Sequence, residues 1–303
     1  MNNGLSTHQL IWRSLLFVPA NNGRFIEKAH TRGADGIILD LEDSVPVGER
    51  LQARRALMDS AALAARRGAD VLVRINAEAD ESAADLDAAV HPGVRALLVP
   101  KVEDPDALCA LSDQVARLEA QRGMASGGVG FVVLVESAAG LLRAEAIARA
   151  EPRTLALELG GEDFALSTGM LPDAETLAVP KQMVLYAARS AGLIPLGILG
   201  SIADYADLDA YRITAQRSRR FGFEGAACIH PSGVPILNDV FTPTAAEAAH
   251  AQRLVDTYAD AQRAGSGAVS VDGKMIDVPI VERARQLLAR VQAIRARQAA
   301  TQS

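Results

Sequence analysis

The chain has 303 residues, of which 49% are hydrophobic and 22% charged, a balance typical of a globular protein with a large core. Its formal net charge of −6 includes no basic excess, which argues against nucleic acid as a partner. Two isolated cysteines, no signal-like leader and no apolar run of 18 residues together predict a cytoplasmic protein with no membrane association.

Strand-like and helical segments alternate along the chain. Eight runs rich in Val, Ile and Leu are typical of strands buried on both faces: 13–20, 36–43, 71–76, 96–102, 131–137, 154–160, 193–199 and 225–231. Segments with helical periodicity separate them, as at 24–35, 49–70 and 104–123. This pattern predicts a (β/α)8 TIM barrel. The alternative is an open doubly wound sheet, but its glycine fingerprint is missing after the first strand.

A helical extension is predicted beyond the eighth strand. Residues 242–265 and 279–298 have helical periodicity, and the glycine-bearing joint 265–277 between them indicates a hairpin or lid. The predicted organisation is therefore an N-terminal tail (1–12), a catalytic barrel domain (13–240) and a C-terminal helical extension with the lid (241–303).

Polar residues gather where the predicted strands end, which is the rim where TIM barrels carry their chemistry. They are Asp40, Glu42, Asp43, Arg74, Asn76, Lys101, Glu136, Glu162, Asp163 and His230. A role in capping the following helices is the alternative, and it suits Asp43 and Ser137. It does not suit Arg74, because a cation at a helix N-terminus opposes the helix dipole. Small residues beside the acids, such as Gly160 and Gly161, are expected to leave room for a substrate.

A series of fragments in chain order resembles the HpcH/HpaI aldolase/citrate lyase family, in its citrate lyase beta-subunit (CitE-like) branch. They are RSLLFVPANNGRFIEKA, GADGIILDLEDSVP, VRIN, VPKVE, VESAAGLL and GGEDF, followed by GKMIDVPIVERA, so the resemblance spans about residues 13–290.

The resemblance implies a carbon–carbon lyase that depends on Mg2+, for which Mn2+ can substitute. Such an enzyme cleaves a 3-hydroxyacyl-CoA thioester such as citryl-CoA into an oxaloacetate-like 2-oxo acid and an acyl-CoA. Malyl-CoA and citramalyl-CoA are alternative substrates, and a non-catalytic subunit that binds a CoA thioester is another possibility. Lys181 and Gly197 depart from the family pattern, which leaves the acyl group open.

The resemblance also implies roles for single residues. Glu136 and Asp163 match the two carboxylates that bind Mg2+ and orient the substrate, and Mg2+ prefers such hard oxygen ligands. Arg74 matches an arginine that holds the substrate carboxylate or thioester oxygen through its planar fork. The structural alternative for Arg74 is a buried ion pair with Asp40 or Glu42. The alternatives for the two acids are a pairing of Glu136 with Arg74 and a helix-capping role for Asp163.

Three further residues match family positions. Arg24 and Lys28 lie in the region that contacts CoA phosphates in relatives, although solvated charges on a helix are the ordinary alternative. Asp277 matches an aspartate that a C-terminal lid carries into the neighbouring protomer as a general acid or base, which implies a homo-oligomer, usually a trimer. The alternative for Asp277 is a helix N-cap, which is compatible with catalysis.

A different chemistry, an aldolase with Lys101 as the Schiff-base lysine, is also considered. It requires a desolvated lysine and no metal, so the paired acids Glu136 and Asp163 argue against it.

Overall fold

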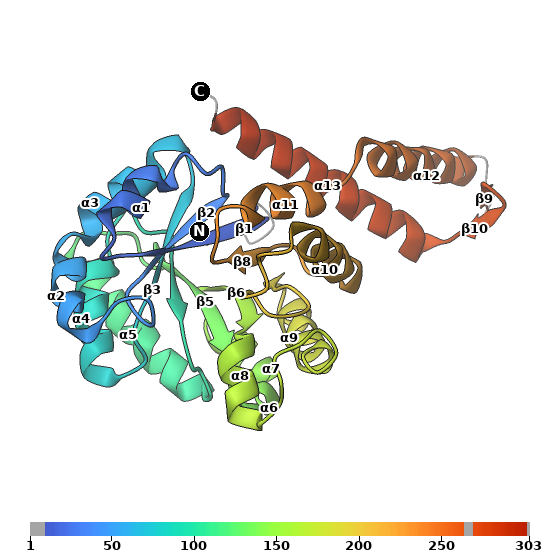
Figure 1. Cartoon of the computed structure of the whole chain (residues 1–303). Coiled ribbons are helices and arrows are strands. Elements are labelled where there is room, and N and C mark those ends of the chain that lie inside the picture. Colours follow the sequence, from blue (N-terminus) through green and yellow to red (C-terminus); the bar gives the residue numbers. More distant parts are fainter. Residues whose placement is uncertain (1–9, 264–268, 302–303) are drawn as a thin grey trace. The chain divides into compact units, whose positions relative to one another are not determined.

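The computed structural model describes residues 10–263 and 269–301, and the chain divides into two compact units between Phe241 and Thr242. In the described part of the first unit, eight parallel strands form one sheet in the order β7-β6-β5-β4-β3-β2-β1-β8 (Figure 1). They are β1 (Ser14–Pro19), β2 (Gly36–Asp40), β3 (Asp70–Arg74), β4 (Ala96–Val99), β5 (Gly130–Val135), β6 (Thr154–Leu159), β7 (Ile194–Leu196) and β8 (Ala226–Cys228).

The sheet closes on itself. The first strand pairs with the last, with Leu16 opposite Cys228, and a parallel bridge between Leu196 and Gly225 joins the end of β7 to the start of β8. A Cβ atom on Gly225 would lie 1.7 Å from the carbonyl oxygen of Trp12, so this junction requires glycine. The predicted TIM barrel is confirmed, and the doubly wound alternative is wrong because an open sheet does not pair its first and last strands.

Helices surround the barrel (Figure 1). They are α1 (Gly23–Ala29), α2 (Val47–Arg55), α3 (Leu57–Ala64), the 3-10 helix η2 (Ala65–Arg67), α4 (Ala79–Ala89), α5 (Pro105–Gln121), α6 (Ala138–Leu142), α7 (Ala144–Ala150), α8 (Gly161–Thr168), α9 (Ala178–Ser190), α10 (Leu208–Phe221) and α11 (Gly233–Val240). None of the helices in the described segments combines the length and the apolar character needed to span a bilayer.

Two apolar layers hold the first unit together. One fills the barrel, with Leu15, Ile38 and Leu134 among its members, and the other lies between the sheet and the helices. Because successive side chains of a strand point to opposite faces, Glu158 shares the inner face of β6 with Ala156 of the barrel core. The strands therefore direct alternate residues either into the barrel or toward the helices.

Residues 10–12, which the sequence analysis placed in a tail, belong to the core. Trp12 is 1% exposed, and its Nε1 donates a hydrogen bond of 2.8 Å to Oδ2 of Asp70, the first residue of β3. The side chain covers the N-terminal end of the barrel, where an open apolar interior would otherwise meet water.

The second unit contains two helices and a hairpin, namely α12 (Ala245–Arg263), β9 (Val269–Val271), β10 (Lys274–Ile276) and α13 (Val278–Ala300). The two strands pair antiparallel around a turn in which Asp272 and Gly273 both have positive φ, as a tight hairpin requires. The predicted helices and hairpin are confirmed over the described residues; positions 265–268 of the predicted joint lie outside them.

Candidate active site

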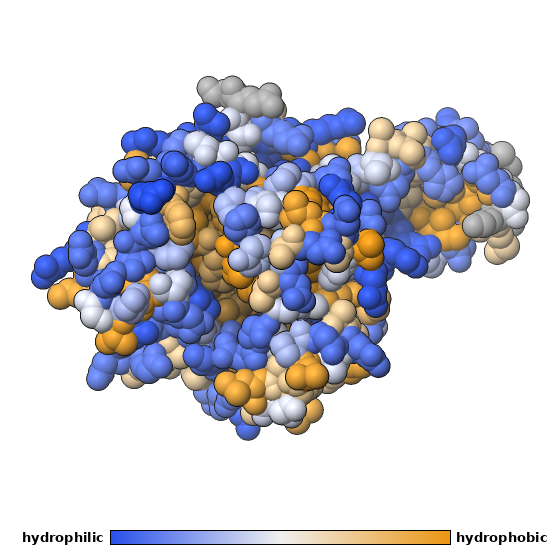
Figure 2. Space-filling view, viewed as in Figure 1, coloured by the Kyte–Doolittle hydropathy of each residue, from blue (hydrophilic) through white to orange (hydrophobic). Residues whose placement is uncertain are grey.

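A cavity of about 400 Å³ opens at the C-terminal ends of the barrel strands, a size ordinary for a small-molecule site. Figure 2 shows a hollow in this face of the barrel unit, with hydrophobic residues inside and hydrophilic residues around it. The charged residues that line the cavity are Asp40, Asp43, Arg74, Glu136, Glu158, Glu162, Asp163 and Lys181. Phe17, Leu134, Ala227 and Ile229 supply apolar lining.

Arg74 is held by acids at the end of the neighbouring strand. Its Nε and Nη2 donate to the two carboxylate oxygens of Asp40 at 2.6 and 2.8 Å, a bidentate pair. Its Nη1 lies 3.0 Å from Oδ2 of Asp43 and 3.1 Å from Oε2 of Glu42. The Phe17 ring packs below the guanidinium carbon, 5.0 Å away. The ion pair considered as the structural alternative for Arg74 is therefore present, and it orients the guanidinium at the cavity wall.

These contacts determine the charge of the cluster. Burial lowers the pKa of Arg74, but the bonds and charge of Asp40 outweigh burial, so the pKa lies above its ordinary value. Burial likewise raises the pKa of Asp40, and the contacts with Arg74 reverse this and leave it lowered. Arg74 and Asp40 are thus both ionised at neutral pH.

Of the two residues predicted as helix caps, Ser137 has this role and Asp43 does not. Ser137 caps α6, since its Oγ accepts a hydrogen bond of 3.1 Å from the N–H of Gly140. The capping role considered for Asp43 is wrong: α2 starts after Pro46, and the carboxylate of Asp43 pairs with Arg74. The guanidinium of Arg74 comes from another strand, so the local sequence around Asp43 could not predict this ion pair.

Glu136, 5% exposed, lies just beyond β5 and faces the cavity. Its Oε2 accepts a hydrogen bond of 2.7 Å from the backbone N–H of Lys101, a residue in the left-handed region (φ +53°). Burial raises the pKa of Glu136 to about 7, and the negative charges of Asp163 and Glu42 act in the same direction. Among the described residues no ion pair joins Glu136 to Arg74, so the pairing alternative for Glu136 is wrong.

Gly160 makes room for Glu136. A Cβ atom at this position would lie 2.4 Å from Oε1 and 2.6 Å from Cγ of Glu136. The space beside this glycine was predicted to receive the substrate, but the carboxylate of Glu136 takes it up. Any side chain at position 160 would displace the acid.

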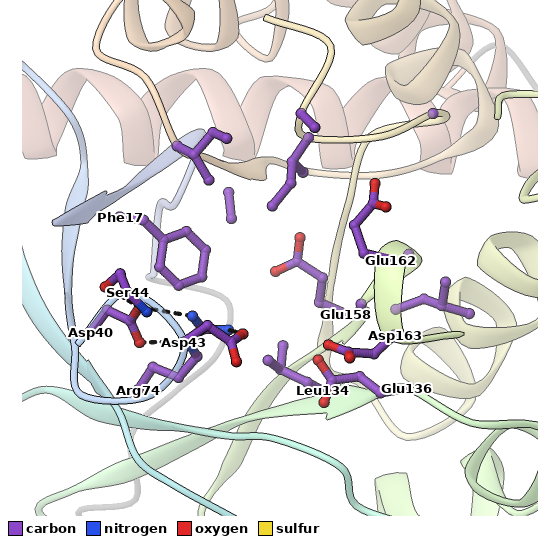
Figure 3. Close-up of a pocket in the computed structure, with 18 of the residues that line it drawn as sticks. Phe17, Asp40, Asp43, Ser44, Arg74, Leu134, Glu136, Glu158, Glu162 and Asp163 are labelled. Atoms are coloured by element: carbon purple, nitrogen blue, oxygen red, sulfur yellow. Dashed lines mark hydrogen bonds and ion pairs between the residues drawn. The ribbon is translucent and has the colours of Figure 1, made fainter. Parts of the chain in front are cut away.

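Asp163 lies in the first turn of α8, whose N-cap is Gly160 and whose start has no side-chain cap, so the capping alternative is wrong. Figure 3 shows Asp163 and Glu136 on one side of the cavity and Arg74 on the other. Two carboxylates that repel each other fit a divalent cation, and Mg2+ typically takes one or two protein carboxylates, with waters or substrate oxygens completing its shell. The described residues contain no cluster of three or more His, Cys, Asp or Glu that would hold a metal without such help.

Lys101 does not suit a Schiff-base role. Its Nζ donates a hydrogen bond of 3.0 Å to Oε1 of Glu42, and its side chain is 44% exposed. The hydrogen bond to Glu42 raises the pKa of Lys101, whereas a nucleophilic lysine requires a lowered one.

The cavity contains two charged residues to which the sequence analysis assigned no role. Glu158, 7% exposed, comes from the interior of β6, and Lys181, 3% exposed, comes from α9. Glu158 could have been noticed as a carboxylate inside the run TLALEL, at a position where strand alternation turns it inward. Lys181 stood out in the sequence only as a departure from the family pattern, and no contact between its helix and the rim was predicted.

Other predicted residues lie away from this lining. Asn76 donates to Asp85 and to the carbonyl of Leu41, which is a structural role. His230 stacks on Tyr205 with ring centroids 4.9 Å apart. Arg24 and Lys28 are exposed on α1.

Asp277 belongs to the second unit and is exposed. Its Oδ1 accepts a hydrogen bond of 3.2 Å from the N–H of Ile280, so it is the N-cap of α13. The capping alternative for Asp277 is therefore confirmed, and capping leaves the second carboxylate oxygen available.

Comparisons with known proteins agree with this geometry. The family model described as HpcH/HpaI aldolase/citrate lyase matches residues 13–231. The citrate lyase subunit beta of Escherichia coli K12 is 32% identical over 92% of this chain and 93% of its own length. A (3S)-malyl-CoA thioesterase of Cereibacter sphaeroides is 34% identical over 94% and 96%. The structure of CitE from Mycobacterium tuberculosis with magnesium, acetoacetate and coenzyme A superimposes with a TM-score of 0.71 at 28% identity, covering 94% of this chain and 99% of that one.

Proposed function

This chain belongs to the HpcH/HpaI aldolase/citrate lyase family and is a carbon–carbon lyase, and we propose that it cleaves a 3-hydroxyacyl-CoA thioester. The products are a 2-oxo acid and an acyl-CoA, as from citryl-CoA, malyl-CoA or citramalyl-CoA. The observation that carries this proposal is the acid pair Glu136 and Asp163, which faces Arg74 across one cavity (Figure 3).

Glu136 and Asp163 are the proposed ligands of Mg2+. When bound there, the ion supplies Lewis-acid polarisation of substrate oxygens and orients them. The M. tuberculosis relative was crystallised with magnesium and coenzyme A, which supports both in this chain. The hydrogen bond from the Lys101 N–H and the space beside Gly160 hold the Glu136 carboxylate in place.

Arg74 is the proposed electrophilic residue. Cleavage moves an electron pair onto the acyl-CoA fragment as an enolate, and a fixed cation at the cavity wall stabilises the oxygen that gains charge. Asp40 and Asp43 hold the guanidinium in place, so little reorganisation accompanies the reaction. Arg24 and Lys28, exposed on the helix that follows β1, are proposed contacts for the CoA phosphates.

Asp277 is the proposed acid that protonates the enolate carbon. It follows the hairpin of β9 and β10, and we place it in the active site of a neighbouring protomer within a homotrimer. Exclusion of water at that step protects the enolate and the thioester.

The proposed activity is tested by incubating the protein with Mg2+ and a panel of citryl-CoA, malyl-CoA and citramalyl-CoA. We expect one of them to yield a 2-oxo acid, detected with a coupled dehydrogenase, together with an equal amount of acyl-CoA. Free CoA is measured separately, because one relative is a malyl-CoA thioesterase. Tight binding of a thioester without any product would indicate the non-catalytic alternative.

The proposed sharing of the site is tested by mixing two inactive variants, Asp277→Asn and Glu136→Gln. Their exchange creates sites with an intact metal pair from one protomer and an intact acid from another, so about a quarter of the sites in an equal mixture should be competent if protomers mix at random. Subunit exchange is followed independently with fluorescent labels. Full exchange without any recovered turnover would place Asp277 in its own protomer's site or limit it to capping.

A further inference from the structure

Among the described residues, Glu158 is the one acid of the cavity lining that has neither a side-chain partner nor a proposed role as a metal ligand. The other acids are engaged or proposed as metal ligands: Asp40 and Asp43 pair with Arg74, Glu162 accepts from Ser201, and Glu136 and Asp163 form the proposed Mg2+ site. A hydrogen bond from the backbone N–H of Ala227 on β8 favours the ionised form of Glu158, and no side chain of the described residues is seen to donate to it. A carboxylate has about four acceptor positions, so Glu158 has several that remain to be satisfied from the cavity.

The position of Glu158 aims it at a bound substrate. It lies on the inner face of β6, opposite Leu134 of β5 and Leu196 of β7. Figure 3 shows its carboxylate pointing into the cavity above Asp163. An acid in such apolar surroundings requires a proton or a donated hydrogen bond.

Lys181 is a nearby counter-charge that does not neutralise Glu158 by contact. Its Nζ donates to the carbonyl oxygens of Ile198 and Gly200, the latter at 2.6 Å, and no ion pair joins it to Glu158 in the described segments. Its charge still acts on Glu158 through space and favours the ionised carboxylate. The charge of Lys181 thus lowers the pKa of Glu158, while the carboxylate oxygens of Glu158 remain available to a substrate.

We propose that Glu158 is the general base that accepts the proton of the substrate hydroxyl, and that Lys181 is a positioning residue that keeps this carboxylate ionised. This inference rests on the proposed function, whose substrate presents its hydroxyl on the carbon that becomes the 2-oxo carbon. The O–H bond breaks and its proton passes to Glu158. The O–H electron pair becomes the second bond of the new carbonyl, and the carbon–carbon pair moves to the acyl-CoA α-carbon as the enolate. A different acid then protonates that carbon.

The titration of Glu158 suits this task. Burial raises its pKa to about 7, which places a general base near the working pH. Its titratable neighbours are Lys181 on α9, Tyr211 on α10 and Cys228 on β8. Burial raises the pKa of Tyr211 and of Cys228, so both are uncharged at neutral pH and Lys181 is the charge that matters.

The test compares Glu158→Gln with Glu158→Asp and with the control Glu145→Gln on α7. Glutamine keeps the size and can accept from Ala227 but cannot take a proton, so cleavage should fall about 10²–10⁴-fold. The aspartate variant should recover part of this loss, and Glu145→Gln, which removes an exposed acid outside the cavity, should stay within about threefold of the parent.

Two further readouts separate proton transfer from a structural role. Exchange of the α-hydrogen of the acyl-CoA product in D2O does not involve the substrate hydroxyl, so Glu158→Gln should retain it. Lys181→Met should move the acid limb of the kcat/KM profile to higher pH, because the carboxylate loses a favourable charge, while Lys181→Arg should restore it.

The outcomes are distinct. Cleavage by Glu158→Gln at the parent rate would overturn the role of Glu158 and leave the proposed function intact. Equal loss of cleavage and α-exchange would also overturn that role, since it indicates a damaged site. A parent protein that cleaves no thioester of the panel would contradict the proposed function itself.

Discussion

Exchange of Glu136 for glutamine is expected to lower Mg2+ affinity by more than about 10²-fold and to abolish turnover. Removal of a residue that only supports a metal ligand already costs about 10–100-fold. Glutamine keeps the hydrogen bond from the Lys101 N–H but removes the charge that holds the ion. Mn2+ binding, followed by electron paramagnetic resonance, measures the effect without reliance on catalysis, and Glu145→Gln, which removes an exposed acid outside the cavity, is the control.

Two additional measurements belong to this prediction. Gly160→Ala removes no ligand, but its Cβ would lie 2.4 Å from Oε1 of Glu136, so we expect weakened Mn2+ binding as the acid is displaced. EDTA should stop turnover of the parent, and added Mg2+ or Mn2+ should restore it. Parent-like Mn2+ affinity in Glu136→Gln would show that the metal binds at another site. Full turnover after chelation would contradict metal dependence.

Replacement of Arg74 by lysine is expected to reduce kcat/KM about 10²-fold or more, with most of the loss in kcat. Lysine keeps a positive charge but lacks the planar fork that grips both oxygens of Asp40 and also reaches Asp43. The cation would no longer be fixed where the enolate oxygen develops. Steady-state kinetics on the substrate identified by the panel measures the change.

A stability measurement must accompany this variant. The guanidinium pairs with the buried Asp40, and complete loss of a partner from a buried ion pair costs about 3–5 kcal/mol of unfolding free energy. Lysine keeps the charge and loses the bidentate hydrogen bonds, so this figure is an upper limit for the variant. Thermal unfolding followed by circular dichroism shows whether the variant is folded at the assay temperature. A folded lysine variant with parent kcat would limit Arg74 to its structural ion pairs.

The local order of the chain determined the fold class and the location of the site. Eight apolar runs, each followed by a helical segment, leave few arrangements other than a closed parallel barrel, because buried parallel strands need helical crossovers. The same order placed Asp40, Arg74, Glu136 and Asp163 at one rim, since the carboxyl ends of parallel strands meet at the same edge. These features depend on the hydrophobic periodicity of each segment and on the order of the segments, and both can be read directly from the sequence.

Which partner each side chain meets was decided by the tertiary structure. Lys101 and Glu136 are 35 positions apart, and Gly160 contacts Glu136 from the next strand. Trp12 became core because it contacts the start of β3, and Asp43 became an ion-pair partner because Arg74 approaches from another strand. Glu158 and Lys181 are in one cavity only because α9 packs behind β6. Such contacts depend on barrel closure and side-chain packing. A shift of about one ångström turns a hydrogen bond into a steric clash, and no local sequence pattern specifies distances that finely.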